Sequence, residues 1–303
     1  MATPQAGIFA LGTRTHHHLE FDLRPGTVPA DVVAATDRLR EPHVTSGGCN
    51  LVVGFGADLW RQLSAAPPDD LGDFREIVGL DGHLAPSTQH DLWIWFHGTG
   101  TDVVLDAAVQ ATAALAPVGD LAHETACFVY HDSRDLTGFI DGTENPTPTE
   151  GPGVACIPEG RPGAGGSHVL AQRWVHDLDG FGALDQPDQE RVFGRSKPDS
   201  VAIPRDIRPA DAHIRRAELL DAEGEERPIH RRSVPYGTVR ERGLYFLGFS
   251  AERERFDGML AQMYGTSGDG LHDRLLDFTT AVTGSYYFAP SLEELAAIGF
   301  AES

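Results

Sequence analysis

The spacing of apolar residues in the first half of the chain changes repeatedly between the two-residue period of strands and the longer period of helices. A strand is predicted over residues 7–23, and a helix over 29–40 that opens with Pro29, which suits a first helical turn. A second helix is predicted over 102–115. Further strands are predicted at 50–55, 92–97 and 126–130. The order strand, helix, strand, strand, helix, strand is the ferredoxin-like pattern.

The second half repeats this order with additions. Strands are predicted at 168–176, 211–219, 227–233, 244–249 and 285–288, and helical segments at 188–193 and 251–264. The Gly- and Pro-rich segment between the halves is predicted to be irregular. We therefore expect an α+β protein with two ferredoxin-like modules, residues 1–142 and 167–303, joined by a connecting loop over 143–166.

The charge of the chain argues against nucleic-acid and membrane partners. Its 303 residues carry 24 Lys and Arg against 45 Asp and Glu, a formal net charge of −21. Such a surface repels nucleic acid and anionic lipid, and the longest apolar runs are too short to cross a bilayer. The sequence predicts neither kind of partner.

The cysteines and the N-terminus favour a reducing compartment. Cys49, Cys127 and Cys156 lie far apart and form no C-x-x-C pair, so neither a disulfide framework nor a zinc knuckle is indicated. The first residues lack the basic and apolar regions of a secretory signal. We expect reduced, mostly buried thiols in a cytoplasmic protein.

The most specific local feature is the segment GFIDGTENP at residues 138–146. Asp141 lies between two glycines, which permit backbone conformations closed to other residues and a close approach to a ligand. Such a loop can direct the carboxylate into a pocket. The alternative is a surface turn in which Asp141 caps its own backbone.

Histidines and arginines supply further candidates. His16, His17 and His18 lie on a predicted strand, where neighbouring side chains point to opposite faces, so the three cannot bind one metal ion. In the segment IHRRSVPYG at 229–237, the same alternation places Arg231 and Ser233 on one face. The alternative for this segment is a pair of solvent-exposed arginines on an edge strand.

Five segments together resemble the dye-decolorizing peroxidases, and the compact form is most similar to the bacterial B-type subfamily. They are GIFALGTR at 7–14, the GFIDGTENP segment, DAHIRR at 211–216, the segment around Arg231, and GSYYFAPS at 284–291. The resemblance implies a dimeric α+β barrel-like fold with one haem b per chain, held mainly by the second module. It implies reduction of hydrogen peroxide and oxidation of bulky aromatic donors through a ferryl intermediate. Anthraquinone dyes and phenolics are the expected donors, with Mn(II) as a further candidate.

The resemblance also implies roles for particular residues around the haem. His213 is the first choice for the axial ligand of the iron, and His176 is its competitor, with His123, His168 and His230 behind. Asp277 is the candidate carboxylate that hydrogen-bonds the ligand, because a buried Asp in an apolar run needs a partner. An exposed Asp at a helix end is the alternative.

The catalytic candidates follow from the same resemblance, and the propionate-binding candidates are chosen for their positive charge. Asp141 is expected to relay a proton between the peroxide oxygens, and Arg231 to keep Asp141 ionised and stabilise the departing oxygen. Ser233 is a second polar group beside Arg231. Which of Asp141 and Arg231 contributes more stays open. Arg195 and Lys197 are candidates for the haem propionates.

Two other functional classes are consistent with the sequence. One is a protein that binds haem, delivers it or removes its iron with little peroxidase turnover. The other is a ferredoxin-like oxygenase or binding module without haem. For the peroxidase we expect a homo-oligomer, and no encapsulation in a protein nanocompartment, because the chain ends at residues 300–303 soon after its last recognisable segment.

Overall fold

Two antiparallel sheets close into a barrel at the centre of the molecule. The computed structural model describes residues 2–40 and 48–299. The first sheet has the spatial order β2(Cys49–Phe55), β5(Leu92–Gly98), β1(Thr15–Leu23), β6(Gly119–Phe128). The second has the order β12(Ser285–Ala289), β7(Ser167–His176), β10(Arg242–Ser250), β9(Val234–Gly237). Both orders are ferredoxin-like, so the predicted α+β fold of two such halves is confirmed.

The two sheets pair with each other at two places, and each pairing consists of one residue pair. Phe288 of β12 pairs with Phe55 of β2, and Cys127 of β6 pairs with Tyr236 of β9. Within the described residues, β11(Thr279–Ala281) and β8(His230–Arg231) extend the second sheet, while β3(Ile77–Val78) and β4(Leu84–Ala85) form a separate hairpin. Closure removes most of the free sheet edges.

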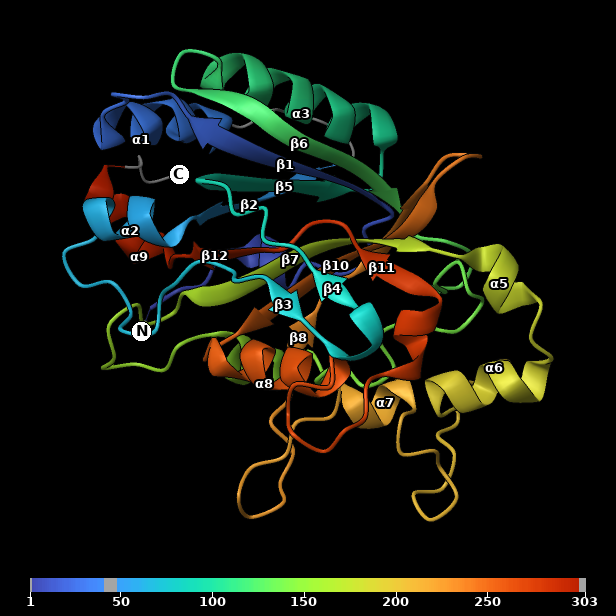
Figure 1. The fold of residues 1–303 in the computed structure, drawn as a ribbon. Helices are drawn as coiled ribbons and strands as arrows, with labels where there is room; N and C mark the ends of the chain where they lie inside the picture. The colour runs from blue at the N-terminus through green and yellow to red at the C-terminus, as the bar shows by residue number, and fades with distance from the viewer. Residues whose placement is uncertain (1, 41–47, 300–303) are drawn as a thin grey trace.

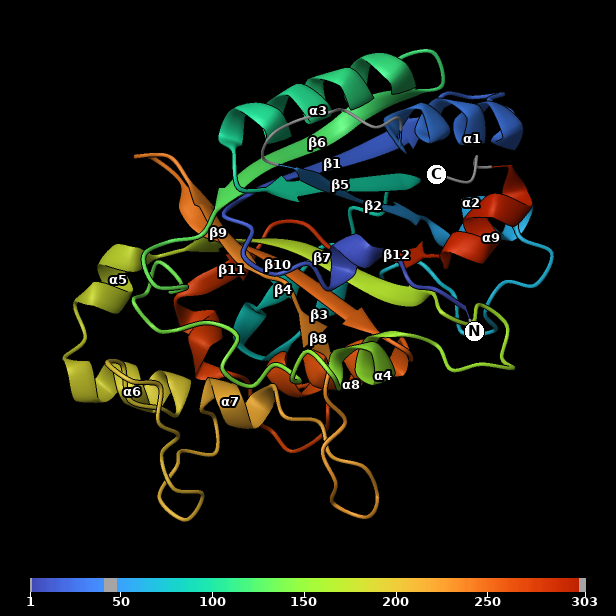
Figure 2. The ribbon, with the colours of Figure 1, turned by 180° about the vertical axis from the view of Figure 1, so that it is seen from behind.

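Helices cover the outer faces of the barrel (Figures 1 and 2). Over the first sheet lie α1(Pro29–Asp37) and α3(Thr101–Leu115), whose apolar residues pack on Leu19, Ile94 and Phe96. Against the second sheet lies α8(Glu254–Met263), which packs on Leu170 and Trp174. The remaining helical segments are η1(Ala6–Ile8), η2(Arg38–Arg40), α2(Ala57–Leu63), η3(Leu80–Gly82), α4(Gly151–Ala155), α5(Leu178–Gly182), α6(Gln186–Phe193), α7(His213–Arg216), η4(Arg274–Asp277) and α9(Leu292–Ile298).

Several titratable side chains lie inside the barrel. His16 and His18 stack on Trp95 inside the barrel, whereas His17 points to the other face and pairs with Glu124. The predicted alternation of the three histidines is confirmed. Glu20 is buried in the same interior and accepts a hydrogen bond of 2.6 Å from the hydroxyl of Tyr287. Burial shifts the pKa values of these groups, downward for His16 and His18 and upward for Glu20.

Several predicted strands were wrong or too long. Residues 211–219 contain the short helix α7 instead of a strand, because Ala and Arg favour helix and the run is too short for a clear period. Of residues 227–233, only His230–Arg231 pair with β10, because Pro228 has no N–H to contribute to a ladder. The first strand begins at Thr15, after η1 and a turn at Gly12 with a φ of 76°.

The sequence reading also missed α9, although its signal was present. Ser291 and Glu294 form a capping box at its start. No helix among the described residues is long and apolar enough to cross a membrane. Residues 300–303, on which the expectation about encapsulation rests, lie outside the described part of the chain.

Candidate active site

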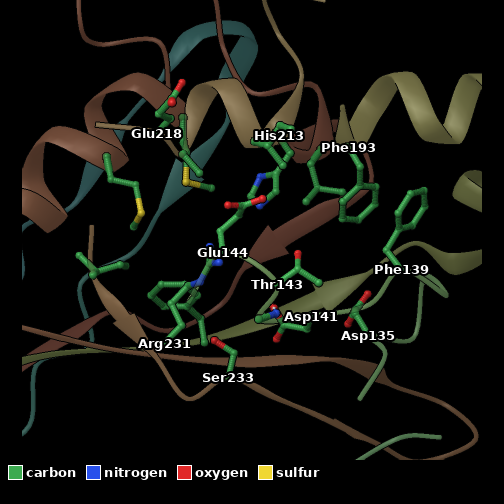
Figure 3. Close-up of a pocket in the computed structure, with 18 of the residues that line it drawn as sticks. Asp135, Phe139, Asp141, Thr143, Glu144, Phe193, His213, Glu218, Arg231 and Ser233 are labelled. Atoms are coloured by element: carbon green, nitrogen blue, oxygen red, sulfur yellow. The ribbon is translucent and has the colours of Figure 1, made fainter. Parts of the chain in front are cut away.

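A cavity of about 410 Å³ lies on the outer face of the second sheet, which is a volume typical of small-molecule sites. Leu244 and Phe246 of β10 form part of its floor. Met259 and Met263 of α8 lie over them, and His213 contributes from α7. Figure 3 shows His213 on one side of the cavity and Asp141, Arg231 and Ser233 on the other. Apolar side chains and about as many polar ones line the cavity, and the polar ones include several arginines and carboxylates.

His213 is held by a carboxylate, but not by the one expected. Its Nδ1 lies 2.6 Å from Oδ2 of Asp273, a side chain with no solvent exposure. Asp277 instead contacts His272 and His83 outside the cavity lining, so its assignment as the partner of His213 was wrong. The reason is local: Asp273 is the N-cap of η4, and Asp277 lies at the far end of this helix. With Nδ1 occupied by Asp273, His213 offers Nε2 to a ligand.

The competing histidine is already engaged on both sides of its ring. Nδ1 of His176 lies 2.7 Å from Oγ1 of Thr279, and Nε2 lies 3.1 Å from Oδ1 of Asp135. Binding a metal ion in the cavity through either nitrogen would break one of these hydrogen bonds. Of these two candidates, His213 is therefore the one with a nitrogen available at the cavity.

Arg231 reaches the cavity from a strand that is tied to the GFIDGTENP segment. The side-chain amide of Asn145 donates to the carbonyl of Arg231 at 2.7 Å and accepts from its N–H at 2.8 Å. The buried Nε of Arg231 has no hydrogen-bond partner among the described residues. A guanidinium in this state is ready to bind an added ligand. Asn145 was missed by the sequence reading, although it belongs to the motif.

The expected faces of this segment agree with the lining of the main cavity and with the contacts of Arg232. Arg231 and Ser233 line the main cavity, and the hydroxyl of Ser233 accepts from the N–H of Leu247 at 3.3 Å. Arg232 points the other way, donates to the carbonyl of Ile8 and lies over the ring of Trp95. Ser233 is thus positioned beside Arg231.

The loop that carries Asp141 is fixed by glycines and by an aromatic anchor. Gly138 has a φ of 91°, and a Cβ there would lie 2.7 Å from Lys197, so a side chain would be both strained and crowded. Phe139 is buried and stacks on Phe193 at 3.9 Å between ring centroids. With its neighbours anchored, Asp141 lines the cavity, as the sequence predicts.

The environment of Asp141 combines burial with a nearby positive charge. Burial raises the pKa of Asp141 above its ordinary value, and the guanidinium of Arg231 opposes this rise. The N–H of Gly142 donates to Oδ1 of Asp141 at 2.7 Å and favours the ionised form. The result is a carboxyl group that takes up a proton more readily than an exposed Asp.

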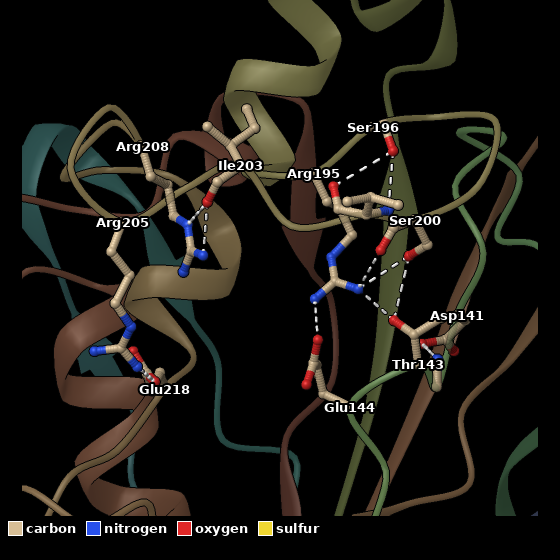
Figure 4. A network of polar contacts seen from close by, with 12 residues as sticks. Asp141, Thr143, Glu144, Arg195, Ser196, Ser200, Ile203, Arg205, Arg208 and Glu218 are labelled. Carbon is tan, nitrogen blue, oxygen red and sulfur yellow. Dashed lines mark hydrogen bonds and ion pairs between the residues drawn. The ribbon is translucent and has the colours of Figure 1, made fainter.

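Arg195 lies beside the same loop in a network of polar contacts (Figure 4). Its side chain is only 4% exposed and contacts Thr143, Ser200 and Glu144, the last at 2.8 Å. It lines the cavity, as expected for a cofactor contact, but these donors already have protein partners. Lys197 donates to Gln189 at 2.6 Å and is not part of the cavity lining.

The sequence matches two halves of one protein family. Residues 5–123 match the N-terminal part of Dyp-type peroxidases, and residues 132–294 match the C-terminal part. A dye-decolorizing peroxidase of Rhodococcus erythropolis is 37% identical over 257 residues, which cover 84% of this chain and 75% of that protein. The chain belongs to the Dyp-type peroxidase family and is an oxidoreductase that acts on peroxide.

Solved structures agree over nearly the whole fold. An encapsulated DyP-type peroxidase from Mycobacterium smegmatis superposes with a TM-score of 0.90 at 31% identity, covering 97% of this chain and 98% of that one. A DypB variant from Rhodococcus jostii, solved in complex with heme, superposes with a TM-score of 0.90 at 31% identity, covering 97% of each chain.

The residues of this chain fit a haem group. His213 offers Nε2, and its other ring nitrogen is hydrogen-bonded to a buried carboxylate, which is the arrangement that orients a metal-ligating histidine. Across the cavity, Arg231 has a buried nitrogen without a partner among the described residues. The apolar side chains of Leu244, Phe246 and Met259 suit a flat macrocycle.

Proposed function

We propose that this protein binds one haem b per chain in the cavity, with His213 as axial ligand, and uses hydrogen peroxide to oxidise bulky aromatic donors. The observation that carries the proposal is the pairing of His213 with Asp273 on one side of a single cavity that has Asp141 and Arg231 on the other. Haem, when bound, would supply both electrons for the cleavage of peroxide and then take electrons one at a time from the donors. The protein supplies orientation, proton transfer and charge stabilisation.

Asp141, Arg231 and Ser233, on the side of the cavity opposite His213, have different roles. With haem bound to supply the two electrons that cleavage of peroxide requires, Asp141 would accept the proton from one peroxide oxygen and return it to the other, which leaves as water. Arg231 stabilises negative charge on the departing oxygen and opposes the rise in the pKa of Asp141. Ser233 adds a hydroxyl on the same side.

Anthraquinone dyes and phenolics are the donors that we propose, with Mn(II) as a further one. The lining contains five carboxylates, and three of them belong to glutamates, Glu144, Glu218 and Glu226. Burial raises the pKa of Glu226, and the neighbouring charges of Glu218 and Glu144 add to this rise. A divalent cation would relieve such repulsion between like charges.

We further propose that the chain is a B-type enzyme and works as a free homo-oligomer. The near-complete coverage of the Rhodococcus jostii DypB variant, 97% of each chain, supports a compact form without large insertions. Light scattering on the purified protein tests the oligomeric state.

The test of the function is an absorption spectrum of the haem-reconstituted protein, before and after one equivalent of hydrogen peroxide, for wild type and His213→Ala. We expect a Soret band that peroxide shifts in the wild type, and a disturbed or missing band in the variant. A Soret band that peroxide does not change would favour a haem-handling protein with little turnover. No Soret band at all would contradict haem binding.

The hydrogen bond from His213 to Asp273 gives a second test. Replacing Asp273 by asparagine removes the anionic partner, and we expect haem affinity or activity to fall about 10- to 100-fold, as for other groups behind a metal ligand. Haem titration of the apoprotein and the iron reduction potential measure the change. The control is Asp206→Asn, which removes the same charge at an exposed position outside the cavity. Equal losses in both variants would contradict the role of Asp273.

A further inference from the structure

Two histidines and an aspartate form a cluster outside the haem cavity. His83 follows η3 in the β3–β4 hairpin, His272 precedes η4, and Asp277 ends it. One ligand atom from each of the three lies within 4.8 Å of the others. The two imidazoles are about one-fifth exposed and the carboxylate is 44% exposed, so the cluster is open to solvent on one side. None of these residues lines the cavity described above.

The distances within the cluster suit a metal ion better than a network of hydrogen bonds. Oδ1 of Asp277 lies 3.4 Å from Nε2 of His83 and 3.2 Å from Nε2 of His272. Ligands at about 2.0–2.1 Å from zinc in a tetrahedron lie about 3.3–3.4 Å from each other. Both distances are therefore close to the edge of such a tetrahedron.

Asp81 completes the arrangement behind the cluster. Its Oδ2 lies 3.3 Å from Nδ1 of His272, on the opposite side of the ring from Asp277. A carboxylate at this place fixes the ring tautomer and directs Nε2 to the ion, as is usual for metal-binding histidines. The alternative is that His272 contacts the two carboxylates directly, without a metal ion.

We propose that His83, His272 and Asp277 bind one Zn²⁺ ion, with Asp81 orienting His272 and water in the open position. Two imidazoles and one carboxylate are a ligand set that zinc prefers, whereas Mn²⁺ and Mg²⁺ prefer oxygen ligands. Because the three ligands lie outside the cavity lining, zinc binding requires neither bound haem nor peroxidase turnover.

The ion would join two segments that are distant in sequence. His83 belongs to the hairpin, and His272 directly precedes Asp273, the partner of His213. Zinc therefore braces the segment that positions the carboxylate behind the haem ligand. Asp277, which the sequence analysis predicts as the partner of the haem ligand, would thus be a zinc ligand instead.

Calorimetric titration with ZnCl₂ of the haem-loaded protein, first freed of metals with a chelator, tests the site. We expect one equivalent to bind to the wild type, with affinity that falls as the pH is lowered because the imidazoles must be neutral. His272→Ala and His83→Gln should each lose about 100-fold or more in affinity, and Asp81→Asn about 10- to 100-fold. MnCl₂ should bind far more weakly.

A matched control and a stability readout make the test decisive. His131→Asn removes an exposed histidine elsewhere and should leave zinc binding unchanged, and Asn tolerates the φ of 47° found there. Zinc should raise the melting temperature of the wild type and of this control but not of His272→Ala. Equal zinc affinity in the wild type and both histidine-cluster variants would overturn the proposal, as would the absence of any tight site in the wild type.

Discussion

Replacing Asp141 by asparagine is expected to slow the reaction with hydrogen peroxide by about 10²- to 10⁴-fold while haem stays bound, because the amide cannot accept the proton. Asp141 is held at the cavity by a loop anchored at Phe139, and its Oδ1 accepts a hydrogen bond from the N–H of Gly142 in the same loop. Stopped-flow mixing with peroxide, followed at the Soret band, measures the rate.

Replacing Arg231 by glutamine should lower the same rate by about 10²- to 10³-fold, the usual cost of losing one donor to a developing negative charge. It should also change the pH dependence. The pKa of Asp141 is already raised by burial, and Arg231 opposes that rise, so its removal raises the pKa further. The rate falls as the pH drops through this pKa, and the fall should therefore begin at higher pH in the variant.

The control for charge is Arg240→Gln, which removes an exposed guanidinium in the turn between β9 and β10. It should leave both the rate and its pH dependence unchanged. If Asp141→Asn reacts at the wild-type rate while Arg231→Gln does not, the carboxylate is not the proton acceptor and the guanidinium alone carries the activation. The double variant tells whether the two residues act as a unit.

The barrel and the side of the site formed by Asp141, Arg231 and Ser233 could be predicted from the sequence, because the patterns that indicate them are strong and local. Long alternating strands predict the two ferredoxin-like orders, and the GFIDGTENP motif identifies Asp141. Strand alternation selects Arg231 and Ser233 over Arg232, and the cavity lining agrees. Each inference needs only a few neighbouring residues.

The other side of the site could not be predicted in the same way. His213 lies on a four-residue helix that carries no clear period, so it was placed on a strand. Asp277 was chosen because it lies in an apolar run, but η4 is too short to bury both of its ends, and its N-cap, Asp273, faces His213. The contact joins residues 60 positions apart, and no local pattern specifies such a pair.

Lowering the pH from 7.5 to 5 is expected to destabilise the protein by roughly 6 kcal/mol through three buried histidines. Burial lowers the pKa of His16 to about 3, of His97 to about 2 and of His230 to about 4. The unfolded chain binds a proton at each histidine below about pH 6.5, but the folded chain does not, so stability falls as the pH decreases. Each contributes about 2 kcal/mol at pH 5, and a typical protein has only about 5–15 kcal/mol in total.

His18 permits a direct test of this account. Burial also lowers its pKa well below the ordinary value, and neither ring nitrogen has a hydrogen-bond partner among the described residues. His18→Leu places an apolar side chain of similar size beside Tyr245. It also removes an imidazole that becomes protonated in the unfolded chain at pH 5. Urea unfolding at pH 7.5 and pH 5 should show a smaller loss of stability in this variant than in the wild type. His17→Gln is the control, because His17 lies outside the barrel interior and pairs with Glu124. An acid sensitivity equal to that of the wild type in His18→Leu would mean that the barrel histidines do not govern acid stability.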